Sequence, residues 1–235
     1  MSFRIDYNEI MELVVRQLTN LFVYDSTKDA PALELALQNA IQRSEKCFGA
    51  ISNKYYHCNG HSHFNPFHSG QYSIFLYYLS NSLWALNTQY QSLSDRIYYL
   101  NKALNGLDLY YEVEMPEIFF LDHSIGSVIG RARYANYFAF SQNCTVGNNK
   151  GIYPRFGENV CLMAGAKVLG DSYIESHVIL SANCYVKDQN IPSCSIVFGA
   201  SPNLIIKPKD RQYFVDNMQT YFFIPPHFVF PVTSK

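Results

Sequence analysis

Apolar residues recur with a six-residue period over the second half of the chain. Every sixth position from 156 to 186 is apolar, namely Phe156, Leu162, Val168, Ile174, Leu180 and Val186. Four positions after each of the first five stands a further apolar or small residue, namely Val160, Ala166, Ser172, Val178 and Cys184. Because neither an ordinary helix nor a lone strand repeats every six residues, this pattern predicts a solenoid whose coils stack both sets in a narrow interior.

The same frame extends upstream and is interrupted once. It recurs at Val128, Tyr134, Phe140 and Val146, and the second set continues through Ala132, Phe138 and Cys144. The segment Gly147–Arg155 breaks the count, and the period ends near Ile191-Pro192. We therefore predict coils on both sides of an irregular segment.

The first half of the chain has the three- and four-residue spacing of amphipathic helices. Four such stretches are marked by Ile10 to Leu21, Leu33 to Phe48, Leu76 to Leu86 and Leu93 to Leu104. We interpret Asp25–Pro31 as a turn between the first two. The pattern changes near Met115-Pro116, so we predict an α-helical domain over 1–115, a solenoid domain over 116–206 and a C-terminal tail over 207–235. The tail is expected to lie on the solenoid or on a neighbouring subunit.

Composition narrows the classes of partner. The chain has 235 residues, of which 48% are hydrophobic, and a formal net charge of −1, so no electrostatic argument favours nucleic acid or an anionic membrane surface. No stretch approaches the eighteen apolar residues of a membrane span. Six cysteines occur without a CxxC pair or a signal peptide, which favours a reduced, cytoplasmic setting. Cys144 and Cys184 fall in the interior set, where a thiol is a small apolar filler.

Several short motifs resemble those of one acyltransferase family. They are Leu121-Asp122-His123 followed by Val128-Ile129-Gly130, then Gln142 to Gly147, the coil Ala164-Gly165-Ala166-Lys167-Val168-Leu169-Gly170, and Phe67-His68-x-x-Gln71. Over residues 64 to 205 the chain resembles the serine acetyltransferase family. The resemblance implies an α+β fold in which an α-helical domain precedes a left-handed parallel β-helix of hexapeptide repeats. It also implies a homotrimer, possibly paired into a dimer of trimers, that transfers acetyl from acetyl-CoA in clefts between subunits.

Acetyl transfer to a hydroxyl requires a base, because a neutral alcohol is a weak nucleophile at pH 7. His123 is our candidate, since imidazole is the commonest general base and is mostly neutral at that pH. The resemblance implies that Asp122 faces the acceptor and that a carboxylate from an earlier coil orients the histidine. Glu114 stands roughly at that position, and Glu112 is the alternative.

The resemblance also implies coenzyme contacts along the coils. Small residues leave room for pantetheine beside the backbone, and Ala164, Gly165, Ser181 and Ala182 match those positions. Lys187 and Lys207 are candidates for the phosphates. No metal is expected, since the predicted coils offer only His123 and His177 as histidines. A cluster of His57, Cys58, His61, His63 and His68 matches no four-ligand zinc spacing, so we interpret it as a polar loop.

One departure from the family pattern leaves the identity of the acetyl acceptor open. Where the family presents an Arg-His pair before a proline, this chain has Ile152-Tyr153-Pro154. The loss removes a bidentate partner for the carboxylate of serine. Lys150 and Arg155, together with Arg131 and Arg133, could rebuild a basic site, whereas Tyr153 could stack on a sugar.

Three functions follow from these residues. The first is an acetyl-CoA-dependent O-acetyltransferase acting on serine or on a hydroxyl of a sugar, nucleotide sugar or glycan. The second is a sugar N-acyltransferase, whose amine nucleophile needs less deprotonation. The third is a catalytically inactive assembly protein that kept the family's shape. The Asp122-His123 pair favours an enzyme.

Overall fold

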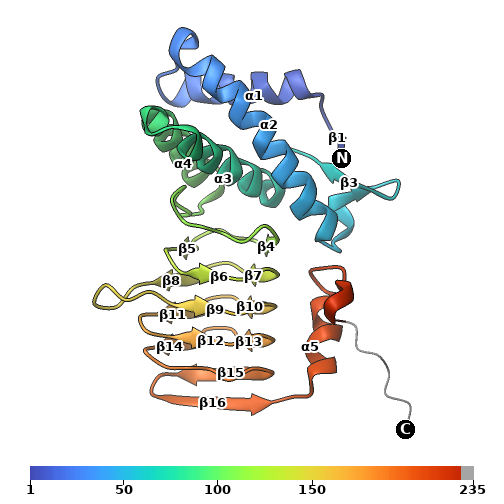
Figure 1. Ribbon diagram of the computed structural model, residues 1–235, viewed down its shortest axis with the longest axis vertical. Coiled ribbons are helices and arrows are strands. Elements are labelled where there is room, and N and C mark those ends of the chain that lie inside the picture. Colours follow the sequence, from blue (N-terminus) through green and yellow to red (C-terminus); the bar gives the residue numbers. More distant parts are fainter. Residues whose placement is uncertain (229–235) are drawn as a thin grey trace.

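An α-helical domain stands on one end of a β-solenoid (Figure 1). The structure is a computed structural model that describes residues 1–228. The helical domain contains α1 (Tyr7–Leu21), α2 (Ser26–Ala50), α3 (Ser69–Leu86) and α4 (Gln91–Asn105), with the short strands β1 (Ser2–Phe3), β2 (His57–Cys58) and β3 (His61–Phe64) and the single turns η1 (Lys54–Tyr56) and η2 (Thr88–Tyr90). Helix α3 is the centre of this domain, because it packs against both α2 and α4.

Local sequence signals account for the helix ends. Asp6 and Glu9 form a capping box at the start of α1, with the Glu9 amide donating to the Asp6 carboxylate at 2.9 Å. Gly106 follows α4 in the left-handed conformation, with φ +63°, as is typical of a C-terminal cap. The four predicted helices are all present.

The turn expected over Asp25–Pro31 is instead the first part of α2. The Asp25 carboxylate accepts the Thr27 amide at 3.0 Å and caps the helix at Ser26. Asp29 then forms two hydrogen bonds with Arg96 of α4, at 2.8 and 3.0 Å. These contacts outweigh the unfavourable propensity of Pro31 inside the helix, a case of tertiary structure overriding local preference.

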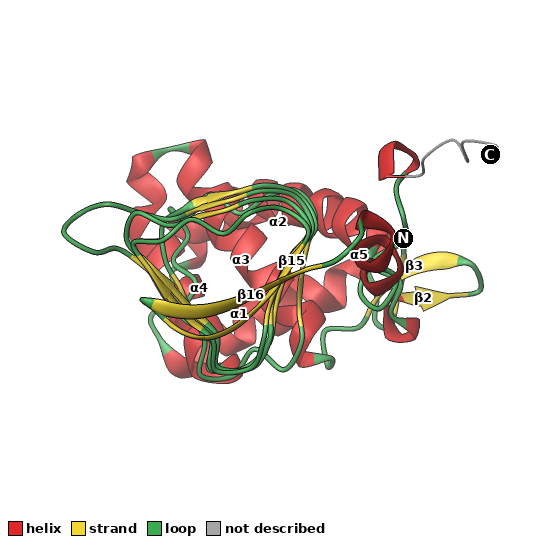
Figure 2. Ribbon diagram, turned by 90° about the horizontal axis from the view of Figure 1, so that it is seen from below, coloured by secondary structure: helices red, strands yellow, loops and turns green. Residues whose placement is uncertain are grey.

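The solenoid is a three-sided prism, and each of its faces is a sheet of parallel strands (Figure 2). The first face holds β4 (Phe119–Leu121), β7 (Phe138–Phe140), β10 (Val160–Leu162), β13 (Val178–Leu180) and β15 (Ser195–Ala200). The second holds β5 (Val128–Ile129), β8 (Thr145–Gly147), β11 (Lys167–Leu169) and β14 (Tyr185–Lys187), and the third holds β6 (Arg133–Tyr134), β9 (Arg155–Phe156) and β12 (Tyr173–Ile174). The fold class predicted from the sequence, helices followed by a left-handed parallel β-helix, is confirmed.

The interior of the prism is formed by the two sets of residues that define the six-residue period. All eleven positions of the two sets between 156 and 186 are buried. Cys144 and Cys184 are buried among them, as predicted, and burial raises the pKa of the Cys184 thiol to about 11. The first coils are filled by aromatic rings, and the Phe138 ring packs against those of Tyr134 and Phe156 with centroids 4.9 and 5.1 Å apart.

The first coil departs from the predicted frame by one residue. Val128 is exposed, and Ile129 takes the interior position opposite Val146. Leu121 and Phe140 also pair, so Ile129 lies eight positions after Leu121, whereas Val146 lies six positions after Phe140. The two additional residues lie at the corner that holds His123, which has a φ of +52°.

The C-terminal residues pack on the solenoid, as one of the two sequence alternatives predicted. Strand β16 (Asn203–Pro208) pairs antiparallel with β15, and α5 (Arg211–Met218) and η3 (Pro226–Phe228) follow it. Figure 1 shows α5 beside the ends of the first-face strands. The rest of the predicted tail, 229–235, lies outside the described residues. Within residues 1–228, no helix combines the length and apolarity needed to cross a bilayer.

We expect the folded protein to lose stability in mild acid because His177 is buried beneath the C-terminal residues. Its ring is buried against Phe228, and burial, together with the Arg211 charge, lowers its pKa to about 4. The unfolded chain takes up this proton near pH 6.5 and the folded chain only near 4, so this part of the stability is complete above about 6.5 and falls as the pH drops toward 4. Urea unfolding at pH 7.5 and pH 5 should show a smaller drop for His177→Gln than for the unmodified protein. Equal drops would contradict this assignment.

Candidate active site

Asp122 and His123 lie at the corner between the first and second faces. His123 is the second residue after β4, its backbone is left-handed, and its side chain is 82% exposed. Its Nε2 lies 3.6 Å from Oδ1 of Asp122. The His123 ring is therefore accessible to a substrate, and the Asp122 carboxylate lies next to it.

Asp122 heads a column of residues that continues along this corner. Its amide donates to Phe140 at 2.9 Å, and the amides of Ser141, Met163 and Ser181 make the equivalent bonds to the next coils at 2.9 to 3.0 Å. The four side chains therefore occupy the same place in successive coils. Ala164 and Ala182 follow this column at the turn, one residue further along their coils.

A cavity of about 460 Å³ runs down the first face under α5. Two of the predicted coenzyme residues, Ser181 and Ala182, line it. Its other walls are mainly apolar and come from the solenoid face, α5 and the residues after α5, namely Cys161, Met163, Ile179, Ile196, Phe198, Phe214, Met218 and Tyr221. The cavity therefore extends along the same coils as the Asp122 column.

The two lysines predicted to meet phosphates lie in different places. Lys207 of β16 places its Nζ 5.2 Å from the ring centroid of Phe198, at the lower end of the cavity. Lys187 ends β14 on the second face, and it does not line the cavity. Neither lysine lines the cavity, but Lys207 lies next to Phe198, which does.

Gly165 is explained by coil packing. Its φ is +74°, and a Cβ at this position would lie 2.3 Å from Oδ1 of Asn183 in the next coil. The backbone turn and the close approach of two coils both require glycine. Gly165 follows Ala164 at the same corner, and its amide donates to Gln142 at 2.8 Å.

The predicted orienting carboxylates are not in contact with His123. Glu114 is exposed and precedes β4, whereas Glu112 is paired with Arg131. Within residues 1–228, Asp122 is the carboxylate found within 4.0 Å of the His123 ring nitrogens. A second neighbour of His123 is His68, the N-cap of α3, whose pKa is lowered by burial and by the His123 charge.

The predicted acceptor residues lie at another corner, between the second and third faces. Tyr153 and Arg155 line a notch of about 570 Å³ together with Arg131 and Arg133. Arg155 lies 3.6 Å from Asp171, which also lines the notch.

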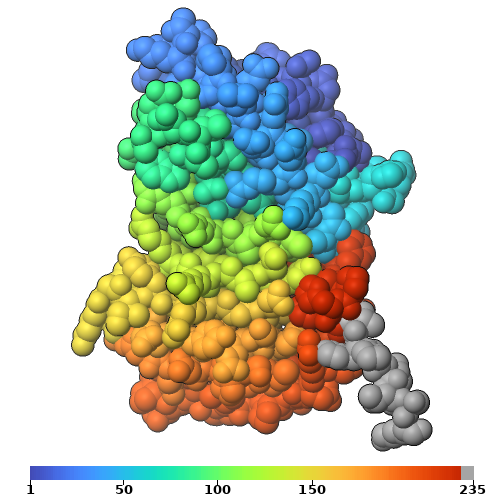
Figure 3. Space-filling model, viewed as in Figure 1, coloured from blue at the N-terminus to red at the C-terminus, as the bar shows by residue number. Residues whose placement is uncertain are grey.

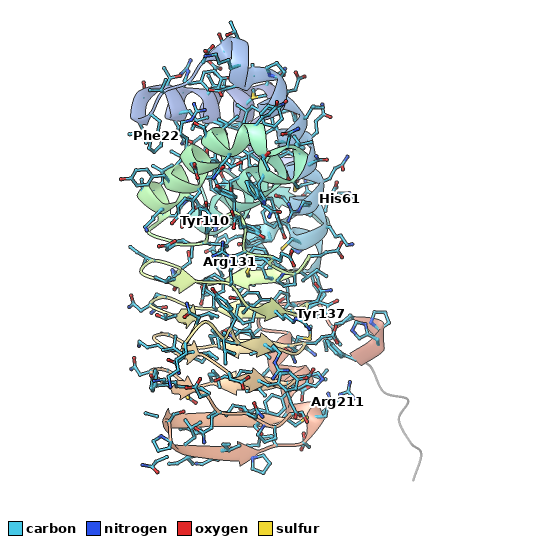
Figure 4. The ribbon with its side chains drawn as sticks, turned by 60° about the vertical axis from the view of Figure 1, so that its left-hand side comes forward. Phe22, His61, Tyr110, Arg131, Tyr137 and Arg211 are labelled. Atoms are coloured by element: carbon cyan, nitrogen blue, oxygen red, sulfur yellow. The ribbon has the colours of Figure 1, made fainter. Side chains whose placement is uncertain are left out.

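The loop that ends at this notch projects from the prism on the side away from α5 (Figures 1 and 2). It carries Lys150, which is exposed with a φ of +53° and does not line the notch. Arg131 lies on the first coil below Tyr110 (Figure 4), with its guanidinium 6.0 Å from that ring. Within one chain, the second face therefore separates these residues from His123.

Sequence reasoning missed the cavity walls that the C-terminal residues supply. Tyr221 and the residues of α5 carry no six-residue period, so nothing in the sequence assigned them to a coil. Cys161 and Met163 point outward from β10 and its following turn, between interior positions that the period did identify. Their outward direction follows from strand alternation, but the helix that covers them does not.

Comparison with known proteins identifies the family that this chain resembles. No family model matches the chain. It is 35% identical over 107 residues to a serine acetyltransferase of Staphylococcus epidermidis, a match that covers 39% of this chain and 44% of that protein. The corresponding Staphylococcus aureus enzyme (strain Mu50) is 37% identical over 102 residues, covering 37% and 42%. The chain thus spans less than half the length of the curated relatives it matches.

Solved structures show the same fold over a larger part of the chain. Serine acetyltransferase from Vibrio cholerae matches with a TM-score of 0.62 and 21% identity, covering 77% of this chain and 72% of that one. The Neisseria gonorrhoeae enzyme matches with a TM-score of 0.62 and 16% identity, covering 86% and 87%. A serine acetyltransferase in complex with CoA matches with a TM-score of 0.60 and 19% identity, covering 75% and 74%. The chain thus has the β-helix fold of these enzymes, and part of its sequence is similar to serine acetyltransferases.

Proposed function

We propose that this protein is an acetyl-CoA-dependent O-acetyltransferase with His123 as its general base. The observation that carries the proposal is the placement of Asp122-His123 at the head of a column that continues to Ser181 and the adjacent cavity. The homologous region in the staphylococcal serine acetyltransferases supports the same activity.

The proposed reaction is direct attack of an acceptor hydroxyl on the thioester. His123 takes the hydroxyl proton as the oxygen bonds to the carbonyl carbon, and it then returns a proton to the departing CoA sulfur. Asp122, whose Oδ1 lies 3.6 Å from Nε2 of His123, is the neighbouring anion when the imidazolium forms between these steps. No cysteine is needed as a nucleophile, and burial holds the Cys161 thiol protonated by raising its pKa to about 12.

We assign the coenzyme to the corner of Ala164 and Ala182 and the adjoining cavity. Small residues at successive turns leave backbone groups accessible to the amides of pantetheine. The apolar walls suit its methyl groups, and a solved structure with this fold is described as a complex with CoA. Lys207 stands at the lower end of the cavity, where a phosphate would emerge.

Lys207→Ala should weaken coenzyme binding without affecting the chemical step. Removal of one ammonium next to a phosphate should raise the KM for acetyl-CoA roughly tenfold with kcat unchanged, since the loss is about one charge-assisted hydrogen bond. Lys187→Ala is the matched control on the second face and should change neither constant. Equal effects of the two substitutions would argue against this path for the coenzyme.

We propose that the acceptor site is completed between copies of the chain. The second face separates His123 from the notch of Tyr153 and Arg155, so a neighbouring copy is needed to bring the two corners together. A homotrimer, possibly paired into a dimer of trimers, is the arrangement implied by the family resemblance. Serine and a sugar hydroxyl are both retained as acceptors, because the notch offers arginines and a tyrosine.

Release of free CoA thiol from acetyl-CoA tests the activity and ranks the acceptors. Serine, other amino acids, amino sugars and nucleotide sugars should be supplied separately to the purified protein. Acceptor-dependent release with a hydroxyl compound is the expected result. Release with amino sugars alone would favour a sugar N-acyltransferase, and no release with any acceptor would favour an inactive assembly protein.

A further inference from the structure

The residues that follow α5 are held against both domains of the protein. The Ser52 amide at the end of the helical domain's α2 region donates to the Tyr221 carbonyl at 3.0 Å, and the Phe223 amide donates to Ala50 at 2.9 Å. Figure 3 shows this segment wedged between the helical domain and the lower coils. We call residues 219–223 the clamp segment. These two hydrogen bonds, at Tyr221 and at Phe223, attach the clamp segment to the end of α2 and fix the backbone position of Tyr221.

The clamp segment places the Tyr221 side chain at the upper end of the cavity. Its ring lies 5.4 Å from that of Phe120, which stands two residues before Asp122 on β4. Tyr221 and Cys161 both line the cavity, and the hydroxyl is close enough to the Cys161 thiol for that group to affect its pKa. The hydroxyl therefore lies where the cavity approaches Asp122.

This hydroxyl is a hydrogen-bond donor whose neighbour is a thiol. Burial raises the pKa of Tyr221, and the nearby Cys161 and Asp122 raise it further, so the group stays protonated at neutral pH. Thiol sulfur is a poor acceptor compared with a carbonyl oxygen. A carbonyl group that entered this end of the cavity would make the better hydrogen bond.

We propose that Tyr221 is a further catalytic residue that donates a hydrogen bond to the carbonyl oxygen of the acyl thioester. The inference rests on the proposed acetyltransferase function. When the acceptor oxygen bonds to the carbonyl carbon, its proton moves to His123 and negative charge develops on the carbonyl oxygen. The carbon–sulfur bond then breaks, the sulfur receives the proton from His123, and an ester and free CoA leave. Tyr221 stabilises the charged intermediate more than the thioester, which lowers the barrier.

Tyr221→Phe tests this role because it keeps the ring, its contact with Phe120 and the backbone of the clamp segment. Loss of an oxyanion donor typically lowers kcat by about 10²-fold or more, so we expect that loss with the KM for acetyl-CoA changed less than twofold. The melting temperature and the calorimetric affinity for free CoA should match those of the unmodified protein. Tyr99→Phe, on the exposed side of α4, is the control and should leave kcat unchanged.

The outcomes separate this inference from the proposed function. A Tyr221→Phe variant that keeps kcat within twofold, in a protein whose activity depends on His123, would overturn the role of Tyr221 alone. A fall in kcat accompanied by a lower melting temperature would also overturn it, since the hydroxyl would then be a structural group. Absence of acceptor-dependent CoA release from the unmodified protein would overturn both proposals.

Discussion

His123→Ala is expected to lower kcat about 10²- to 10⁴-fold, the range for loss of a positioned general base. The hydroxyl of the acceptor would then have to lose its proton to water during the attack. The KM for acetyl-CoA should change little, because His123 lies at the head of the Asp122 column and not among the residues that line the cavity. Steady-state release of CoA thiol measures both constants.

A matched histidine variant separates the chemistry from general effects of substitution. His61→Ala changes an exposed histidine of the β3 strand and should leave kcat unchanged. A His123→Ala variant with more than a tenth of the normal kcat would contradict the general-base role. It would instead be the result expected of an amine acceptor, whose nucleophile needs less deprotonation.

Phe138→Ala is expected to lower the free energy of unfolding by about 3 to 5 kcal/mol, the range for phenylalanine truncation in a core. Phe138 is fully buried and contacts the rings of Tyr134, Phe140 and Phe156. A short coil closed on all three faces has little freedom to collapse into the space left by a ring. Urea unfolding monitored by circular dichroism gives the change.

An exposed ring provides the control for this substitution. Phe67 is 69% exposed, and Phe67→Ala should change the free energy of unfolding by less than about 0.5 kcal/mol. A loss of under 1 kcal/mol for Phe138→Ala would mean that the upper coils are not packed as described.

The solenoid interior could be predicted because hexapeptide coils repeat their environment. Each regular coil places the same two positions inside, so a short list of apolar residues between Phe156 and Val186 determines the register of these coils. The interruption at Gly147–Arg155 was also visible as an irregular segment. Asp122 and His123 were recognisable because they stand in motifs that resemble those of the serine acetyltransferase family.

The rest of the site depends on contacts that have no local signature. Ile129 takes the interior position predicted for Val128 because the corner that holds His123 has two additional residues. The six-residue period does not extend through that corner. The cavity exists because α5 and the clamp segment cover outward residues of β10, and this covering depends on hydrogen bonds to Ser52 and Ala50, more than a hundred residues earlier. Separation of His123 from Tyr153 is a property of the three-faced prism and not of the spacing between them.

The bond formed in the product tests the central claim most directly. The acceptor that supports CoA release should be incubated with acetyl-CoA and the protein, and its mass then measured before and after treatment with hydroxylamine, which cleaves oxygen esters and leaves amides intact. We predict a gain of one acetyl group that hydroxylamine removes and that is absent when His123→Ala replaces the unmodified protein. An acetylated product that resists hydroxylamine, or equal product from the His123→Ala variant, would contradict O-acetyl transfer with His123 as the base.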